Sequence, residues 1–131
     1  MHEKYSVQWL IEPSKNFRQT VDFYKETIGL ECVDEGVAKT DIHFHRYAQF
    51  RFSNGFTLEI VEPKEQYKEI FVHSIPSLRV DDLEQHCKRL RQKGVVFISD
   101  VLDSGEGLGW TYFEGTDGII MQLEGPYRKA D

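Results

Sequence analysis

Basic residues, cysteines and long apolar runs are all scarce in this chain, and each shortage excludes a class of protein. Sixteen lysines and arginines face 22 aspartates and glutamates, and no basic stripe is interleaved with aromatics, so we expect no nucleic-acid partner. Two cysteines cannot form a disulfide framework, and we expect both to be reduced. No apolar run could span a bilayer or serve as a signal peptide, so we expect no membrane partner and a cytoplasmic location.

Two common catalytic motifs are also missing. No G-x-S-x-G nucleophile motif occurs, and the glycine-rich segment at residues 105–109 lacks the spacing of a dinucleotide-binding loop. We expect that segment to be a flexible loop, not a phosphate cradle. At 131 residues the chain should form a single domain, because half of it would bury too little surface to be stable alone.

What the sequence does contain is a repeat of about 65 residues. Residues 16–19 (NFRQ) and 82–85 (DLEQ) each begin a helical pattern with a capping residue and a glutamine at the third helical position. The turn signals NG at 54–55 and DG at 117–118 recur at nearly the same interval, and each precedes an apolar stretch that ends in proline. Two copies of one unit predict a fold of two similar modules.

Each copy predicts one strand, a helix and three further strands. The expected strands lie at residues 5–12, 30–37, 42–52, 56–62, 74–80, 95–98, 109–114 and 119–124, and the expected helices lie at 16–28 and 82–93. The fold class is therefore α+β, with two tandem β-α-β-β-β modules in a single domain, 1–131. We place module one at 5–63, a linker at 64–73, module two at 74–126 and a tail at 127–131.

The expected hairpin turns determine which side chains share a face of each sheet. If residues 54–55 form a two-residue turn, Phe50 lies opposite Glu59 and shares its face. Phe113 is the equivalent of Phe50 in the second copy of the repeat. His43 and His45 would then face away from Glu59, and we expect both at the surface or facing a dimer partner.

A tandem β-α-β-β-β chain with DFY at residues 22–24 and IGL at residues 28–30 resembles the vicinal oxygen chelate superfamily. Its members include glyoxalase I, bleomycin-resistance proteins and extradiol dioxygenases, and the resemblance covers the chain from about Val7 to Pro126. It implies a glyoxalase-like fold in which two mixed sheets form a U-shaped cleft. It also implies a homodimer.

Metal-dependent members of that superfamily resemble one another at four ligand positions, one on the first strand and one on the last strand of each module. In this chain those positions hold Trp9, Glu59, Ile75 and Gln122. A divalent ion generally needs three or four N, O or S ligands, and neither an indole nor an isoleucine supplies one. We therefore expect no metal and no other cofactor.

A slip in strand register leaves one metal-binding alternative open. Gln8 is adjacent to Trp9, and His73 lies two residues before Ile75. A shift by one residue reverses the face of a strand unless a bulge intervenes. The resulting ligand set for nickel, zinc, manganese or iron would be Gln8, Glu59, His73 and Gln122.

Without a metal, the same positions predict a mostly aromatic site for a small organic molecule around the single carboxylate of Glu59. Glu59 is also the one candidate catalytic residue, as a general base. Its possible cationic partners are Arg46, Arg51 and Arg79. The expected ligand-binding residues are Trp9, Phe50, Glu59, Ile75, Trp110, Phe113 and Gln122.

Three classes of function follow. We favour a metal-independent small-molecule-binding protein of the glyoxalase and bleomycin-resistance type, and the net charge of −6 suits a cationic ligand. The first alternative is a divalent-metal-dependent lyase, isomerase or dioxygenase resembling glyoxalase I. The second alternative is a dimeric scaffold whose site has decayed. The sequence leaves open whether any reaction is catalysed.

Overall fold

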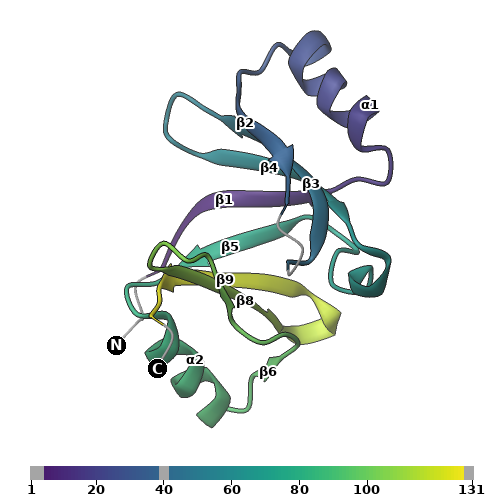
Figure 1. Ribbon diagram of the computed structural model, residues 1–131. Helices are drawn as coiled ribbons and strands as arrows, with labels where there is room; N and C mark the ends of the chain where they lie inside the picture. Colours follow the sequence, from purple (N-terminus) through teal and green to yellow (C-terminus); the bar gives the residue numbers. More distant parts are fainter. Residues whose placement is uncertain (1–4, 39–41, 129–131) are drawn as a thin grey trace. The chain divides into compact units, whose positions relative to one another are not determined.

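The computed structural model describes residues 5–38 and 42–128, and these residues form two compact units (Figure 1). The first unit is Gln8–Ile75. The second unit combines residues 76–128 with the short segment 5–7. Each unit contains strands and one main helix, which confirms the α+β class. Among the described helices, none has the length and apolar character that crossing a bilayer requires.

The first unit has the strand order β2-β3-β4-β1. Strand β1 pairs in parallel with β4, whereas the β2–β3 and β3–β4 pairs are antiparallel. A parallel pair needs a crossover connection, and the helix after β1 begins it. The elements are β1 (Ser6–Pro13), α1 (Phe17–Asp22), the π-helical turn η1 (Phe23–Ile28), β2 (Cys32–Val37), β3 (Phe44–Arg51), β4 (Thr57–Pro63) and the 3₁₀ turn η2 (Glu65–Tyr67).

The second unit repeats this arrangement, with the strand order β5-β9-β8-β6. Strand β5 is parallel to β9, as β1 is to β4, and the helix again follows the first strand. One strand, β7, was not expected, because two residues are too short to show a periodic pattern. The elements are β5 (Ile75–Arg79), α2 (Leu83–Gln92), β6 (Val96–Phe97), β7 (Leu102–Asp103), β8 (Leu108–Glu114), the 3₁₀ turn η3 (Thr116–Gly118) and β9 (Ile120–Pro126).

The two helix starts differ in their capping. Asp82 Oδ1 accepts a hydrogen bond from the Gln85 amide at 3.1 Å, a cap that typically contributes about 1 kcal/mol. Asn16 occupies the equivalent position before α1, but its side chain makes no capping bond. The expected side-chain cap therefore forms only at α2.

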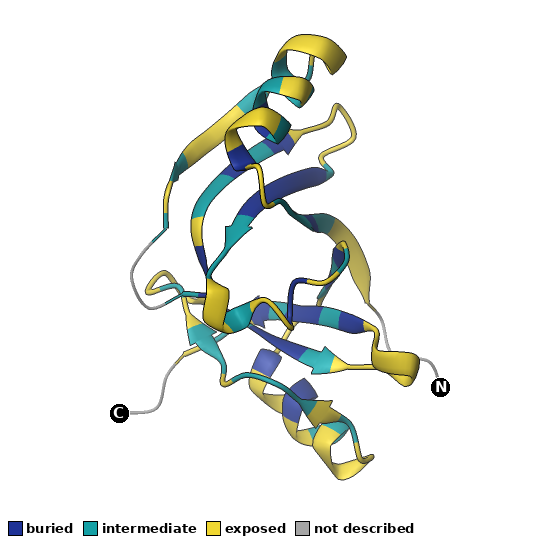
Figure 2. Cartoon of the chain, turned by 90° about the vertical axis from the view of Figure 1, so that its right-hand side faces the viewer, coloured by how far each residue is buried: buried dark blue, intermediate teal, exposed yellow. Residues whose placement is uncertain are grey.

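Each helix packs its apolar side on one face of its own sheet, α1 on β4 and α2 on β9. Figure 2 shows that the outer sides of both helices are exposed. Cys87 is buried in the α2 core, as expected, and both cysteines are free thiols. The α1 core comprises Phe17, Val21, Ala48, Phe50, Leu58 and Ile60, and the α2 core comprises Val80, Leu83, Cys87 and Leu123.

The first hairpin turn has three residues, not the expected two. The Phe52 amide donates to the Phe56 carbonyl at 2.8 Å and closes a loop in which Gly55 has φ +89°. Strand β3 therefore pairs Gln49 with Glu59 and Phe50 with Leu58. Because a shift by one residue moves every side chain to the other face, the prediction that Phe50 shares a face with Glu59 was wrong.

The second hairpin changes in the same way. The Gly115 amide donates to the Ile119 carbonyl at 2.6 Å around a three-residue loop, and β8 pairs Tyr112 with Gln122. Glu59 and Gln122 therefore occupy equivalent positions in their units, as the sequence indicated. The predicted equivalence of the two modules was therefore correct. The prediction of which side chains of the third strand share a face with Glu59 or Gln122 was wrong.

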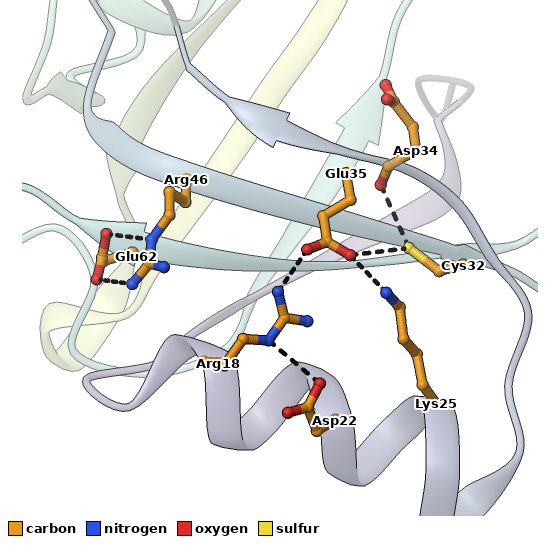
Figure 3. Close-up of polar contacts among 8 residues, drawn as sticks. All are labelled: Arg18, Asp22, Lys25, Cys32, Asp34, Glu35, Arg46 and Glu62. Atoms are coloured by element: carbon orange, nitrogen blue, oxygen red, sulfur yellow. Dashed lines mark hydrogen bonds and ion pairs between the residues drawn. The ribbon is translucent and has the colours of Figure 1, made fainter.

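A network of charged side chains ties α1 and η1 to β2 (Figure 3). Arg18 Nη1 lies 2.7 Å from Glu35 Oε2, and Lys25 Nζ lies 2.6 Å from Glu35 Oε1. Arg18 Nε also donates to Asp22 Oδ1 at 3.1 Å. The hydrogen bonds from Arg18 and Lys25 lower the pKa of Glu35 to about 2.

We expect Glu35→Gln to cost no more than about 1 kcal/mol of unfolding free energy at neutral pH, because solvent screens such exposed pairs. The pKa of Glu35 is lower in the folded state than its ordinary value of 4.5. The wild-type advantage should therefore be complete above about pH 5 and decline as the pH falls towards 2.

Urea unfolding of both proteins at pH 6 and pH 3 measures this difference. Glu26→Gln is the matched control, since Glu26 is exposed on η1 and forms no ion pair with any described residue. A deficit in Glu35→Gln that is equal at the two pH values would contradict the role assigned to its charge.

Candidate functional site

Glu59 is a buried carboxylate in the middle of β4, and it is only 7% exposed. The Trp9 Nε1–H group donates to its Oε1 atom at 3.3 Å, and the Gln49 Nε2–H group donates to its Oε2 atom at 2.9 Å. Both donors are neutral. These two hydrogen bonds therefore orient the carboxylate without cancelling its charge.

Three strands of the first unit place these side chains on one face. In β1, Trp9 lies opposite Thr57 and Ile11 lies opposite Glu59, and in β3, Gln49 lies opposite Glu59. Side chains alternate between the faces of a strand, so all five belong to the face that α1 does not cover. The α1 core lies on the other face.

Tyr47 belongs to the same face, and it was not among the ligand-binding residues expected from the sequence. It lies two residues before Gln49 on β3, and its hydroxyl donates to Asp34 Oδ2 at 3.3 Å. Burial raises the pKa of Tyr47, and the Asp34 and Glu59 carboxylates raise it further. This face therefore combines Trp9 and Tyr47, two aromatic side chains, with carboxylate groups.

In the second unit the equivalent face carries neutral polar groups. Gln122 Nε2 donates to Ser77 Oγ at 2.8 Å, and both residues are buried. Tyr112 lies opposite Gln122, and Trp110 precedes it by two residues, so both share this face. Ile75, the last residue of the first unit, begins β5 two residues before Ser77 and has the same orientation along that strand.

The family follows from a match over most of the chain. A model of the Glyoxalase/Bleomycin resistance protein/Dioxygenase superfamily matches residues 8–123. The chain belongs to this superfamily. This confirms the resemblance that the helix and turn motifs indicated. A comparison with curated proteins gave no match.

Solved structures share the superfamily fold over nearly the whole chain. The hypothetical protein BH1468 from Bacillus halodurans C-125 has a TM-score of 0.75 at 11% identity, covering 98% of this chain and 99% of that one. Methylmalonyl-CoA epimerase from Mycobacterium tuberculosis has a TM-score of 0.73 at 17% identity, covering 93% and 88%. A mutant 4-hydroxymandelate synthase from Streptomyces coelicolor has a TM-score of 0.64 at 14% identity, covering 97% and 50%. Identities this low show the fold alone.

The four positions that hold metal ligands in metal-dependent members of the superfamily do not suit a divalent ion here. The Trp9 ring nitrogen carries a hydrogen that it donates to Glu59, and Ile75 has no donor atom in its side chain. Within residues 5–38 and 42–128, no three His, Cys, Asp or Glu side chains are grouped so that they could hold a metal.

The alternative ligand set gains no support from the strand register. The β1–β4 pairing runs from Trp9 to Pro13 without a shift, and regular alternation along β1 would place Gln8 on the face opposite to Trp9 and Glu59. His73 Nδ1 lies 2.8 Å from the carbonyl oxygen of Ser74. We derive no chemistry through a metal ion.

We expect protein purified without chelator to carry much less than one equivalent of transition metal, because two of the four family positions offer no ligand. Elemental analysis of the purified chain measures this. Near-equimolar nickel, zinc, manganese or iron that is lost in His73→Ala would contradict the prediction. That result would favour an activity resembling glyoxalase I.

Two of the expected ligand contacts lie on the helix-covered faces instead. Phe50 is 1% exposed, and its ring centroid lies 5.9 Å from that of Tyr24. Phe113 packs on the α2 core, with its ring centroid 5.9 Å from that of Phe97. The one-residue change in each hairpin moves both rings away from Glu59 and Gln122.

Two of the three arginines considered as partners for Glu59 form ion pairs elsewhere. Arg46 forms a two-pronged contact with Glu62, at 2.9 and 2.7 Å (Figure 3). Arg79 Nη1 lies 3.7 Å from Glu124 Oε1. Glu59 accepts hydrogen bonds from Trp9 and Gln49.

His43 and His45 have different environments. His43 is buried, and its ring centroid lies 4.3 Å from that of Tyr67, so its expected position at the surface was wrong. Burial lowers the pKa of His43 to about 4, and the positive charge of Lys64 lowers it further. His45 is exposed, as expected.

The glycine-rich segment forms the turn between β7 and β8. The Gly105 amide donates to Asp103 Oδ1 at 2.9 Å, and the amides of Glu106 and Leu108 donate to Ser104 Oγ at 3.1 and 3.3 Å. These amides therefore already have acceptors within the turn. The arrangement agrees with the expectation that the segment is not a phosphate cradle.

Proposed function

We propose that this protein binds a small organic cation, without a resident metal ion, at the face of the first unit that carries Trp9, Gln49 and Glu59. The observation that carries the proposal is the buried Glu59 carboxylate, which two neutral donors hold in one orientation. A carboxylate buried among apolar and aromatic groups interacts more strongly with a cation than one in water does. Burial also makes a carboxylate charge costly, so a cationic ligand would stabilise it.

The aromatic side chains on this face support the same class of ligand. Indole and phenol rings attract ammonium and guanidinium groups through their negative faces. Trp9 donates a hydrogen bond to the Glu59 carboxylate, and the Tyr47 hydroxyl donates to the Asp34 carboxylate. The net charge of −6 also raises the local concentration of cations around the protein.

Glu59 is better suited to anchor a ligand than to remove a proton. Each carboxylate oxygen already accepts one hydrogen bond, so part of its lone-pair capacity is used. A general base must also reach the proton that it abstracts at about 3 Å. The catalytic role considered from the sequence is therefore the weaker of the two proposals for this residue.

A thermal-shift screen tests the proposal with matched sets of small compounds: primary amines, guanidines, quaternary ammonium compounds and cationic antibiotics, each with a neutral analogue of similar shape. We expect the cations to raise the melting temperature, since a ligand at 100 times its Kd adds about 2.7 kcal/mol. Equal shifts with the neutral analogues would overturn the proposal. Stabilisation by methylmalonyl-CoA together with a divalent metal would favour the metal-dependent alternative instead.

We also propose that the protein forms a homodimer. Strand β2 ends the strand order of the first unit and pairs only with β3 among the described strands. Open strand edges are commonly covered by another chain. Sedimentation velocity at micromolar concentration should show a species of twice the 15.4 kDa chain mass. A single monomeric boundary would contradict this.

A further inference from the structure

The second unit contains a surface groove that belongs to none of the positions discussed so far. It has a volume of about 480 Å³ and lies where the chain leaves α2, turns at Gly94 and enters β6. All of its lining residues come from one short stretch of chain, so its shape depends on local structure. They are Arg91, Val95, Phe97, Ile98, Ser99 and Asp100.

Phe97, Ile98 and Ser99, which line the groove, are anchored to the sheet. Phe97 pairs with Phe113 across β6 and β8, and the Ile98 amide donates to the Tyr112 carbonyl at 3.0 Å. Ser99 is held at both ends, because its carbonyl accepts from Thr111 Oγ1 at 2.9 Å and its hydroxyl oxygen accepts from the Tyr112 amide at 3.3 Å. These bonds fix the backbone that lines this part of the groove.

Arg91 lies over the Phe97 ring. Its guanidinium carbon is 4.7 Å from the centre of the Phe97 ring, which is a cation–π arrangement. This contact restrains the guanidinium group, whose N–H groups can donate to a planar acceptor. A carboxylate matches these N–H groups with two parallel hydrogen bonds.

Asp100 places the opposite charge in the same groove. Both Arg91 and Asp100 are exposed, and neither forms an ion pair with any residue in 5–38 or 42–128. The groove is thus lined by one positive charge, one negative charge and the apolar side chains that lie between them in sequence. This lining is complementary to a molecule that carries both charges and an apolar group.

We propose that this groove binds a free α-amino acid with an apolar side chain. The carboxylate would pair with Arg91, the ammonium group would pair with Asp100, and the side chain would contact Val95 and Ile98. This site shares no residue with the proposed cation site around Trp9, Gln49 and Glu59, so either proposal can fail without the other. A binding site for a metabolite in the second unit would give the protein a second ligand.

Three compounds of similar shape test the proposal: L-leucine, isoamylamine, which lacks the carboxylate, and 4-methylpentanoate, which lacks the ammonium group. Titration of the full chain is followed by the amide NMR signals of residues 91–100, up to about 20 mM ligand, in the range of weak small-molecule binding. We expect leucine to bind about tenfold tighter than either analogue, because only leucine engages both charges.

Variants separate a built site from general surface binding. Arg91→Gln should weaken leucine about tenfold and remove its advantage over isoamylamine, and Asp100→Asn should remove its advantage over 4-methylpentanoate. Lys88→Gln and Asp81→Asn are matched surface controls and should leave binding unchanged. Equal binding of all three compounds, or no change in the signals of residues 91–100 with leucine, would overturn the proposal.

Discussion

Replacing Glu59 with glutamine is expected to weaken the binding of an organic cation by about 1–3 kcal/mol, or roughly 5- to 150-fold in Kd. Glutamine keeps the size of the side chain and one oxygen acceptor, but it removes the negative charge. A neutral ligand of the same shape should therefore lose much less affinity. Isothermal titration of the cation and its neutral analogue against both proteins measures the difference.

A control variant and a second variant separate the contribution of the Glu59 charge to ligand binding from that of the Trp9 ring. Glu26→Gln removes one exposed carboxylate on η1 and should leave binding unchanged. Trp9→Ala removes both a hydrogen-bond donor to Glu59 and an aromatic ring, so it should weaken cationic and neutral aromatic ligands alike. If a ligand binds both Glu59→Gln and Trp9→Ala with unchanged affinity, its site lies elsewhere.

One outcome would favour the scaffold alternative. A buried charge without a ligand is a cost to folding, so Glu59→Gln in a protein with no ligand could raise the free energy of unfolding. If no compound binds and this variant is more stable than the wild type, the carboxylate is a remnant. The protein would then be a dimeric scaffold with a decayed site.

Replacing Phe50 with alanine is expected to lower the free energy of unfolding by about 3–5 kcal/mol. Its ring is 1% exposed and packs with Phe17 and Val21 in the α1 core, so truncation leaves a cavity between helix and sheet. A loss of that size is a large part of the stability of a typical domain, about 5–15 kcal/mol. Urea unfolding followed by circular dichroism measures it.

The milder Phe50→Leu variant tests the position of this ring. It should fold with a loss of about 1 kcal/mol and bind the cationic ligand as the wild type does, because Phe50 lies on the helix side of the sheet. Phe23→Leu is the matched control, since Phe23 is 48% exposed and should change stability by less than about 0.5 kcal/mol. A loss of ligand affinity in Phe50→Leu as large as that in Trp9→Ala would show that Phe50 contacts the ligand.

The sequence by itself determined the architecture and the family. Apolar residues at helical spacing, such as Phe17 and Val21 in α1 and Leu83 and Cys87 in α2, are a local signal of which side a helix buries. The constant offset between the two hairpin turns correctly made Glu59 and Gln122 equivalent. These features depend on residues close together in the chain or on a comparison between its halves, so no tertiary contact was needed to recognise them.

Only the tertiary structure decided which side chains surround Glu59. Asn54-Gly55 fits a two-residue or a three-residue loop, and the choice depends on pairing along the whole hairpin. Thr57 to Val61 in β4 are all buried, so burial does not distinguish the two faces of this strand. The polar Thr57 and Glu59 alternate with the apolar Leu58 and Ile60, and this pattern agrees with the observed pairing, whereas the two-residue turn expected at Asn54-Gly55 predicts the other pairing. The Trp9–Glu59 hydrogen bond joins residues 50 positions apart through a parallel strand pair, which no local pattern specifies.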